Sequence, residues 1–151
     1  MKRYALVNYI LSIDIPDDVA SDFGTSSIQI GGEGCYLIQI SIGLKSELYA
    51  TQGDNTGSWV HVKNLDKTGT VEIQIKQVSD AIARFKALCN IYYSLSTEAD
   101  GLTLTLRDLN NNTIAVCNDC VLNKIPDQTF GNEPENQTWT FNAGSITFVN
   151  S

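Results

Sequence analysis

Residues 69–94 read GTVEIQIKQVSDAIARFKALCNIYYS, and the spacing of the apolar residues changes within this stretch. In its first part apolar and polar residues alternate, which is the period of a β-strand with one buried face; the apolar positions are Val71, Ile73 and Ile75. After Ser79 the apolar residues recur at helical spacing; they are Ile82, Phe85, Leu88, Cys89 and Tyr92. Ser79 suits an N-cap and Asp80 suits the first helical turn. We therefore predict a strand followed by a helix of about four turns.

Alternation with the strand period returns along most of the chain. The rows expected to face inward are Tyr36, Ile38, Ile40 and Ile42 in one segment and Leu102, Leu104 and Leu106 in another. Further strands are expected over residues 4–15, 26–30, 47–52, 58–63, 113–122 and 138–149. Closely spaced turns rich in Gly, Asn and Asp separate them, as in hairpins. The predicted fold class is mainly β, an antiparallel β-sandwich or barrel with one α-helix, in a single domain over residues 1–151.

The net charge, the small share of charged residues and the lack of a long apolar stretch exclude some classes of function. The chain has 151 residues, and its 17 acidic and 10 basic residues give a net charge of −7. This balance argues against a protein that reads DNA through phosphate contacts. Charged residues make up 18% of the chain, against roughly 25% in typical soluble domains, which suits a surface that packs against other subunits. No stretch approaches the roughly 20 apolar residues of a membrane helix, so we expect a soluble protein made in a cytoplasm, with no membrane partner.

Candidate catalytic and metal-binding residues are few. His61 is the single histidine and lies on a predicted strand without a nucleophile or zinc motif, which favours a structural role. Cys117 and Cys120 have C-x-x-C spacing, but zinc needs a second pair, and on a regular strand these thiols point to opposite faces unless a bulge intervenes. We expect free thiols at all four cysteines; the other two are Cys35 and Cys89. The polar run 108–119 matches a calcium loop poorly and is interpreted as a turn. No enzyme activity, metal or cofactor is predicted.

Three motifs, with the opening strand and the Gly-rich residues 30–34, resemble structural proteins encoded among the tail genes of contractile-tailed phages. The motifs are Asp66-Lys67-Thr68-Gly69-Thr70-Val71, Leu122-Asn123-Lys124-Ile125-Pro126 and Trp139-Thr140-Phe141-Asn142-Ala143-Gly144-Ser145-Ile146. The matching positions are Lys67, Gly69, Thr70, Pro126, Trp139, Phe141 and Gly144. The chain departs from that family at Ser79-Asp80, where a Ser-Pro pair is common.

The resemblance implies a subunit of the inner tail tube of a contractile phage tail or related injection particle. It implies hexameric rings that stack into a hollow tube through which DNA passes without specific binding. The implied partners are further copies of the chain and the tail sheath and baseplate proteins. The protein would reside in the virion tail after assembly in the bacterial host cytoplasm. From the net charge we add the hypothesis of an acidic lumen, which would keep DNA from adhering.

The polar residues 44–57 are predicted to form a flexible loop that orders when it reaches a neighbouring subunit or ring. The residues proposed for this contact are Glu47, Gly53, Asp54, Asn55 and Gly57. An alternative function stays open, a ligand- or glycan-binding β-sandwich module of a particle surface. A module of this kind is expected to carry an exposed aromatic patch around Trp59.

Overall fold

A computed structural model of the chain describes residues 4–31, 35–95, 101–108, 110 and 112–149. The Gly-rich residues 32–34 lie outside this description. In chain order the elements are a short 3-10 helix η1 (Leu6–Asn8), β1 (Tyr9–Asp14), α1 (Asp17–Phe23), β2 (Ser27–Gly31), β3 (Leu37–Leu44), β4 (Tyr49–Gly53), β5 (Trp59–Lys63), β6 (Gly69–Lys76), α2 (Asp80–Ser94), β7 (Leu102–Asp108), β8 (Thr113–Leu122) and β9 (Asn136–Phe148).

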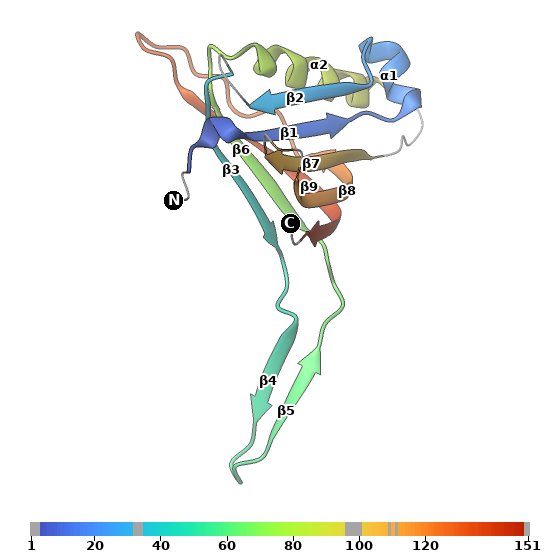
Figure 1. The fold of residues 1–151 in the computed structure, drawn as a ribbon, viewed down its shortest axis with the longest axis vertical. Coiled ribbons are helices and arrows are strands. Elements are labelled where there is room, and N and C mark those ends of the chain that lie inside the picture. Colours follow the sequence, from blue (N-terminus) through green and yellow to red (C-terminus); the bar gives the residue numbers. More distant parts are fainter. Residues whose placement is uncertain (1–3, 32–34, 96–100, 109, 111, 150–151) are drawn as a thin grey trace.

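Seven strands form one sheet in the order β2-β1-β7-β8-β9-β6-β3, and all neighbours are antiparallel. The sheet curls strongly, so that β1 and β2 run across the direction of β3 and β6 (Figure 1). Both α-helices lie at one end of the molecule, beside β1 and β2 (Figure 1). The predicted mainly antiparallel β fold is confirmed. Strands β4 and β5 form a separate two-stranded sheet, and the other seven described strands form the one curled sheet of the body.

The core lies between the sheet and α2. Phe85 of α2 packs against two rings of β9, with ring centroids 5.3 Å from Trp139 and 5.9 Å from Phe141. The alternation predicted for β6 is confirmed, because Val71, Ile73 and Ile75 are fully buried while the residues between them are not. The aromatic motif of β9 and the strand-to-helix stretch therefore build the same core.

The predicted start of α2 is also confirmed. Ser79 has an extended backbone, and its hydroxyl accepts a hydrogen bond from the Ala81 N–H at 3.3 Å. That bond satisfies one of the N–H groups that a helix start leaves unpaired. The N-cap therefore forms without the Ser-Pro pair that is common in the phage proteins that the sequence resembles.

The expectation of one α-helix is wrong, since α1 is a second one. Asp17 and Asp18 occupy its first turn. Pro16 precedes the helix, and Gly24 ends it with a left-handed backbone of φ 95°. Val19 is fully buried in the core, which anchors this short helix beside α2. The start of the first predicted strand is likewise wrong, because η1 occupies part of it.

The inward row predicted for residues 36–42 needs correction. Tyr36 precedes β3, is exposed, and has a left-handed backbone with φ 56°. The register between β3 and β6 then shifts between Leu37 and Gln39. A bulge of this kind reverses which residues face the core. Leu37, rather than Ile38, therefore packs against the core together with Ile40 and Ile42.

Candidate assembly surfaces

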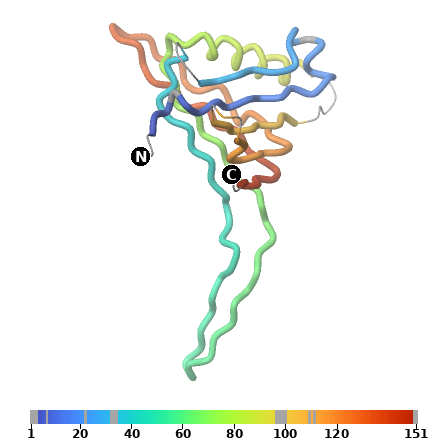
Figure 2. The backbone as a smooth tube through the Cα atoms, viewed as in Figure 1, coloured from blue at the N-terminus to red at the C-terminus, as the bar shows by residue number. Residues whose placement is uncertain are grey.

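A long β-hairpin projects from the body of the protein. It comprises residues 45–68, here called the arm, with β4 and β5 as a separate two-stranded sheet. The arm points away from the end that carries α1 and α2 (Figures 1 and 2). Every residue of β4 and β5 is exposed. Because an isolated two-stranded ribbon is only marginally stable in water, the arm offers two open faces to another molecule.

The two faces of the arm differ in chemistry, since successive side chains of a strand point to opposite sides. The cross-strand pairs Ala50–Val62 and Gln52–Val60 lie on one side. Leu48, which accepts a hydrogen bond from the Asn64 N–H at 2.8 Å, extends this side toward the body. This apolar face consists of Leu48, Ala50, Gln52, Val60 and Val62. The polar-aromatic face consists of Tyr49, Thr51, Trp59, His61 and Lys63.

Asp66 organises the base of the arm. Its carboxylate accepts hydrogen bonds from the Ser46 hydroxyl at 3.1 Å, and from the Thr68 N–H and hydroxyl at 2.9 and 2.7 Å. These bonds, that of the Thr68 hydroxyl above all, hold the pKa of Asp66 below its usual value. The Lys45 N–H also donates to the Thr68 carbonyl at 2.9 Å. The arm therefore leaves the body through a hydrogen-bonded junction.

Asp54 organises the tip of the arm in the same way. Its Oδ1 accepts hydrogen bonds from the Thr56 N–H at 2.8 Å, the Thr56 hydroxyl at 2.7 Å and the Ser58 N–H at 3.0 Å. The Thr56 hydroxyl bond is the main reason that the pKa of Asp54 lies below its usual value. Gly57 completes the turn with φ 87°, which glycine adopts without strain.

The predicted flexible loop over residues 44–57 is thus corrected to part of an ordered hairpin. Gly53 pairs with Trp59 across the two strands, and Asp54 and Gly57 shape the turn between them. Asn55 is exposed in that turn, and Glu47 is exposed near the base of the arm. Four of the five proposed contact residues therefore gather at the tip. Trp59, which sequence reasoning assigned to the alternative function, joins them there.

Two of the sequence motifs lie side by side on β6 and β9. A Cβ atom on Gly69 would collide with the Gly43 carbonyl oxygen and the Ile146 side chain, so only glycine fits. Just before β6, the Lys67 carbonyl accepts a hydrogen bond from the Ile146 N–H at 3.0 Å. Thr70 is exposed on the other face of β6. These motif positions hold the sheet together where the arm begins.

The remaining motif glycine lies opposite a bulge in β8. Asp119 has a left-handed backbone with φ 54°, and a Cβ atom on Gly144 would lie 3.2 Å from the Asp119 Cβ. Such a distance leaves a side chain little room. The third motif ends at Pro126, in the segment between β8 and β9, where its carbonyl accepts a hydrogen bond from Gln128 Nε2 at 2.8 Å. The motif residues are therefore structural and form no single site.

The same bulge is the exception that the sequence analysis named for the C-x-x-C pair. The register between β7 and β8 shifts between Leu102 and Leu104, and both Cys117 and Cys120 are buried in the core. The hydrogen bond between the two thiols lowers the pKa of Cys117 and raises that of Cys120. All four cysteines are free. Within the described part of the chain, no three His, Cys, Asp or Glu side chains gather as a metal site.

His61 lies on the arm, far from the cysteines. Its Nδ1 is 2.8 Å from the hydroxyl of Thr51, its cross-strand partner. His61 thus lies on a strand, as the sequence predicts, and its ring contacts a residue of the neighbouring strand. In the described ranges, no helix is both long and apolar enough to cross a membrane.

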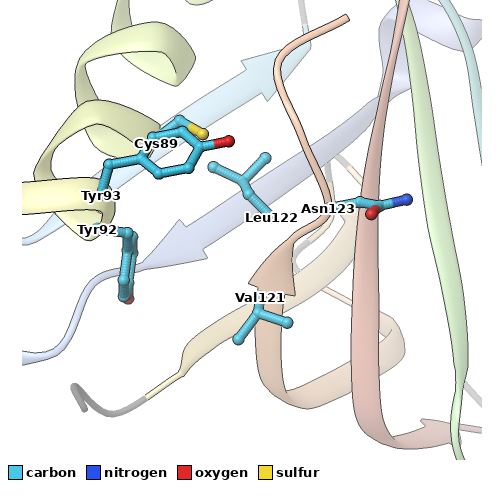
Figure 3. A pocket seen from close by; sticks show the side chains of 6 residues that line it. All are labelled: Cys89, Tyr92, Tyr93, Val121, Leu122 and Asn123. Carbon is cyan, nitrogen blue, oxygen red and sulfur yellow. The ribbon is translucent and has the colours of Figure 1, made fainter.

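A pocket opens where α2 passes the end of β8. It has a volume of about 210 Å³ and is lined by Cys89, Tyr92, Tyr93, Val121, Leu122 and Asn123. Figure 3 shows the first three extending from α2 and the others from the end of β8. Tyr93 and Val121 are 72% and 46% exposed. We call this hollow the α2–β8 pocket; sequence reasoning missed it, because its residues come from segments with no common pattern.

A second, polar hollow adjoins the first. It has a volume of about 240 Å³, and its lining includes Asn123, Lys124, Asp127 and Thr138. Asn123 belongs to both hollows. The surface beside α2 thus changes from apolar to polar over a short distance.

The β-rich body carries an ordered arm whose strands are exposed along their whole length. Residues 13–150 match the family described as the Bacteriophage PhiTE tail tube protein. The chain belongs to this tail tube family, and the resemblance drawn from its motifs is confirmed. The comparison with curated proteins gave no match.

Three solved structures share the fold. A PVC sheath/tube terminator of an extracellular contractile injection system has a TM-score of 0.57 at 9% identity, covering 99% of each chain. The PVC sheath-tube complex gives 0.52 at 12% identity, covering 97% of this chain and 93% of that one. The anti-feeding prophage cap, a tube terminating cap, gives 0.51 at 11% identity, covering 100% and 95%. At these identities the likeness establishes the fold alone.

Proposed function

We propose that the protein is the repeating subunit of the inner tail tube of a contractile phage tail or related injection particle. Its family makes it a tail-tube-related structural protein and a component of such a particle. The observation that carries the finer proposal is the arm, whose strands are exposed along their whole length. In this proposal copies of the chain form stacked hexameric rings in the host cytoplasm, without catalysis, and meet sheath and baseplate proteins.

The two ends of the seven-stranded sheet support ring formation. Among the strands that the structure describes, β2 and β3 each have one neighbour in the seven-stranded sheet. Their outer edges carry backbone groups that can pair with another chain, and natural monomers normally block such edges. Contact between two different surfaces of identical subunits closes a ring when the rotation fits. Edge contacts of this kind would join neighbours within a ring.

The proposed acidic lumen depends on which surface faces the channel. The solvent side of β6 and β9 carries mostly hydroxyl and amide side chains; its exposed members include Thr70, Glu72, Lys76, Thr138 and Asn142. Several carboxylates lie instead on the arm and at α1. An assembled tube with a lumen lined by Lys and Arg would contradict the acidic channel while leaving the tube assignment intact.

Removal of the arm tests the proposed function. The hydrogen bond between Leu48 and Asn64 places these residues side by side, so an Asn-Gly turn can replace residues 48–64. We expect a folded monomer, with a circular dichroism spectrum that retains the helices and sheet, and no tubes in electron micrographs. The control variant Phe130→Ala alters an exposed residue outside the arm and should assemble normally. Normal tubes from the armless variant would contradict the proposal.

One observation also favours the alternative, a glycan-binding module, because Trp59 is 70% exposed. Its cross-strand partner is Gly53, and among the described residues no second ring stacks with it. A lone ring makes a weaker sugar platform than a patch. Glycan binding that is lost on Trp59→Ala, in protein that never assembles, would favour this alternative over the tube.

A further inference from the structure

We infer that the arm tip of one copy docks at the α2–β8 pocket of another copy, with the Trp59 side chain entering the pocket. The inference rests on the proposed function and names the two surfaces that join successive subunits. It concerns the contact between rings, whereas the sheet edges concern contacts within a ring.

Trp59 has the character of an interface anchor. It is 70% exposed, and strand pairing with Gly53 holds its backbone in place. The Asp54 carboxylate fixes the turn beside it through the Thr56 and Ser58 N–H groups. A tip that is ordered before contact loses little entropy on docking. Tryptophan is also among the residues that most often dominate binding energy at the centre of an interface.

The α2–β8 pocket matches such an anchor. Its walls are the apolar and aromatic side chains of Tyr92, Tyr93, Val121 and Leu122, and Asn123 supplies polar groups at its rim. Its volume of about 210 Å³ leaves room for a large side chain. An exposed Tyr93 beside it leaves apolar area that a docked ring would cover.

The contact also brings a basic residue near an acidic one. Asp54 and Trp59 line the same shallow hollow at the arm tip. Lys124 follows Asn123 and lines the adjoining polar hollow together with Asp127. When Trp59 enters the pocket, the Lys124 ammonium group is available to pair with the Asp54 carboxylate. Opposite charges at the rim orient the contact and suppress the reverse arrangement.

Because of where the arm tip and the α2–β8 pocket lie, they can meet only between two copies of the chain. The arm tip and α2 lie at opposite ends of the protein (Figure 1), so the tip is remote from the pocket of its own chain. A contact between two different surfaces leaves the docked pair with one free pocket, on the copy that gave its tip, and one free tip, on the other copy. Addition can then continue from copy to copy along an axis, as a stack of rings requires.

Cysteine crosslinking tests the contact without removing the anchor. Ser58→Cys places a thiol beside Trp59, and Asn123→Cys places one at the pocket rim, both at exposed positions. The background carries Cys35→Ser and Cys89→Ala, because Cys35 is partly exposed and Cys89 lines the pocket, whereas Cys117 and Cys120 are buried in the core. Mild oxidation of assembled protein should give a ladder of covalent multimers on a non-reducing gel, since each copy carries both thiols. Either single variant should stop at the dimer.

Two controls make the outcome decisive. Ser58→Cys combined with Phe130→Cys pairs the tip with an exposed residue outside the pocket and should give no ladder. Trp59→Ala added to the first pair should reduce the ladder at least tenfold. Tubes that form without a ladder, or a ladder unchanged by Trp59→Ala, would overturn the docking contact and leave the tube function standing. Protein that forms no tubes at all would overturn both.

Discussion

Gly69 shows why one position of the motif over residues 66–71 accepts only glycine. Its backbone φ is ordinary, so the requirement is one of space. The Gly43 carbonyl of β3 and the Ile146 side chain of β9 both occupy the position that a Cβ atom would take. The tight approach lies at the end of β6 where the arm leaves the body. A side chain there would push three strands apart.

We expect Gly69→Ala to lower the free energy of unfolding by about 1–3 kcal/mol, the usual cost of overpacking. Denaturant unfolding followed by circular dichroism measures the change. Gly43→Ala is the matched control, since nothing lies within 4 Å of its Cβ position, and it should change stability by less than about 0.5 kcal/mol. Equal effects of the two substitutions would show that the close contact at Gly69 is not the cause.

Asp54 predicts a pH dependence of the arm tip. The hydrogen bonds of the Thr56 hydroxyl and of the Thr56 and Ser58 N–H groups keep the pKa of Asp54 below 3.8. A carboxyl whose pKa is lowered on folding stabilises the fold above its unfolded pKa and loses that effect as the pH falls through its folded pKa. The turn should therefore persist at neutral pH and loosen only below 3.8.

The amide proton shifts of Thr56 and Ser58, followed by NMR during an acid titration, report this transition. We expect both to change with one midpoint below 3.8, and Asp54→Asn should abolish the titration. A midpoint at or above that value would mean that the carboxylate does not hold the turn.

Residue identities predicted the core better than they predicted local deviations of the backbone. Trp139 and Phe141 stood out by motif, and both are fully buried against Phe85. The shared orientation of Cys117 and Cys120 could not be predicted, because it depends on a left-handed residue inside a strand. Asp119 adopts that conformation with φ 54°. Alternation assumes a regular strand and fails wherever a bulge interrupts it.

At the scale of elements, long periodic segments were predictable and short or isolated ones were not. The strand–helix unit of β6 and α2 follows its pattern closely. Helix α1 has seven residues, too few for periodicity to show, although Pro16, two aspartates and Gly24 are its start and stop signals. The arm was predicted as two strands with a loop, but its projection from the body depends on its lack of packing partners, which no local pattern reports.

The apolar face of the arm gives a prediction at this scale. Val62 is about half exposed on that face, so Val62→Lys should change the stability of the monomer by less than about 0.5 kcal/mol. If this face is buried in the tube, Val62→Lys should raise the critical concentration for assembly by at least about tenfold. That factor corresponds to about 1.4 kcal/mol of assembly free energy. Light scattering over a dilution series measures the concentration.

Thr51→Lys is the matched control for that experiment. It adds the same charge on the polar-aromatic face of the arm, between the tip and the base. We expect it to shift the critical concentration much less than Val62→Lys does. An equal shift would mean that the apolar face is not preferentially buried.

At the scale of the whole molecule, the fold separates two tasks. The body buries one continuous core between the curled sheet and the helices, so it has what a stable monomer requires. The arm and the α2–β8 pocket lie outside that core, at opposite ends of the protein (Figure 1). The tube family could be inferred from motifs in the sequence, but the docking surfaces emerged only when distant segments were seen together.

Electron microscopy of the purified protein over a concentration series tests the tube assignment most directly. The account predicts rings that stack into hollow tubes as concentration rises, because each copy carries both the arm and a surface to receive it. A monomer that persists at every concentration, with its fold intact, would contradict the assignment of this chain as a tube subunit.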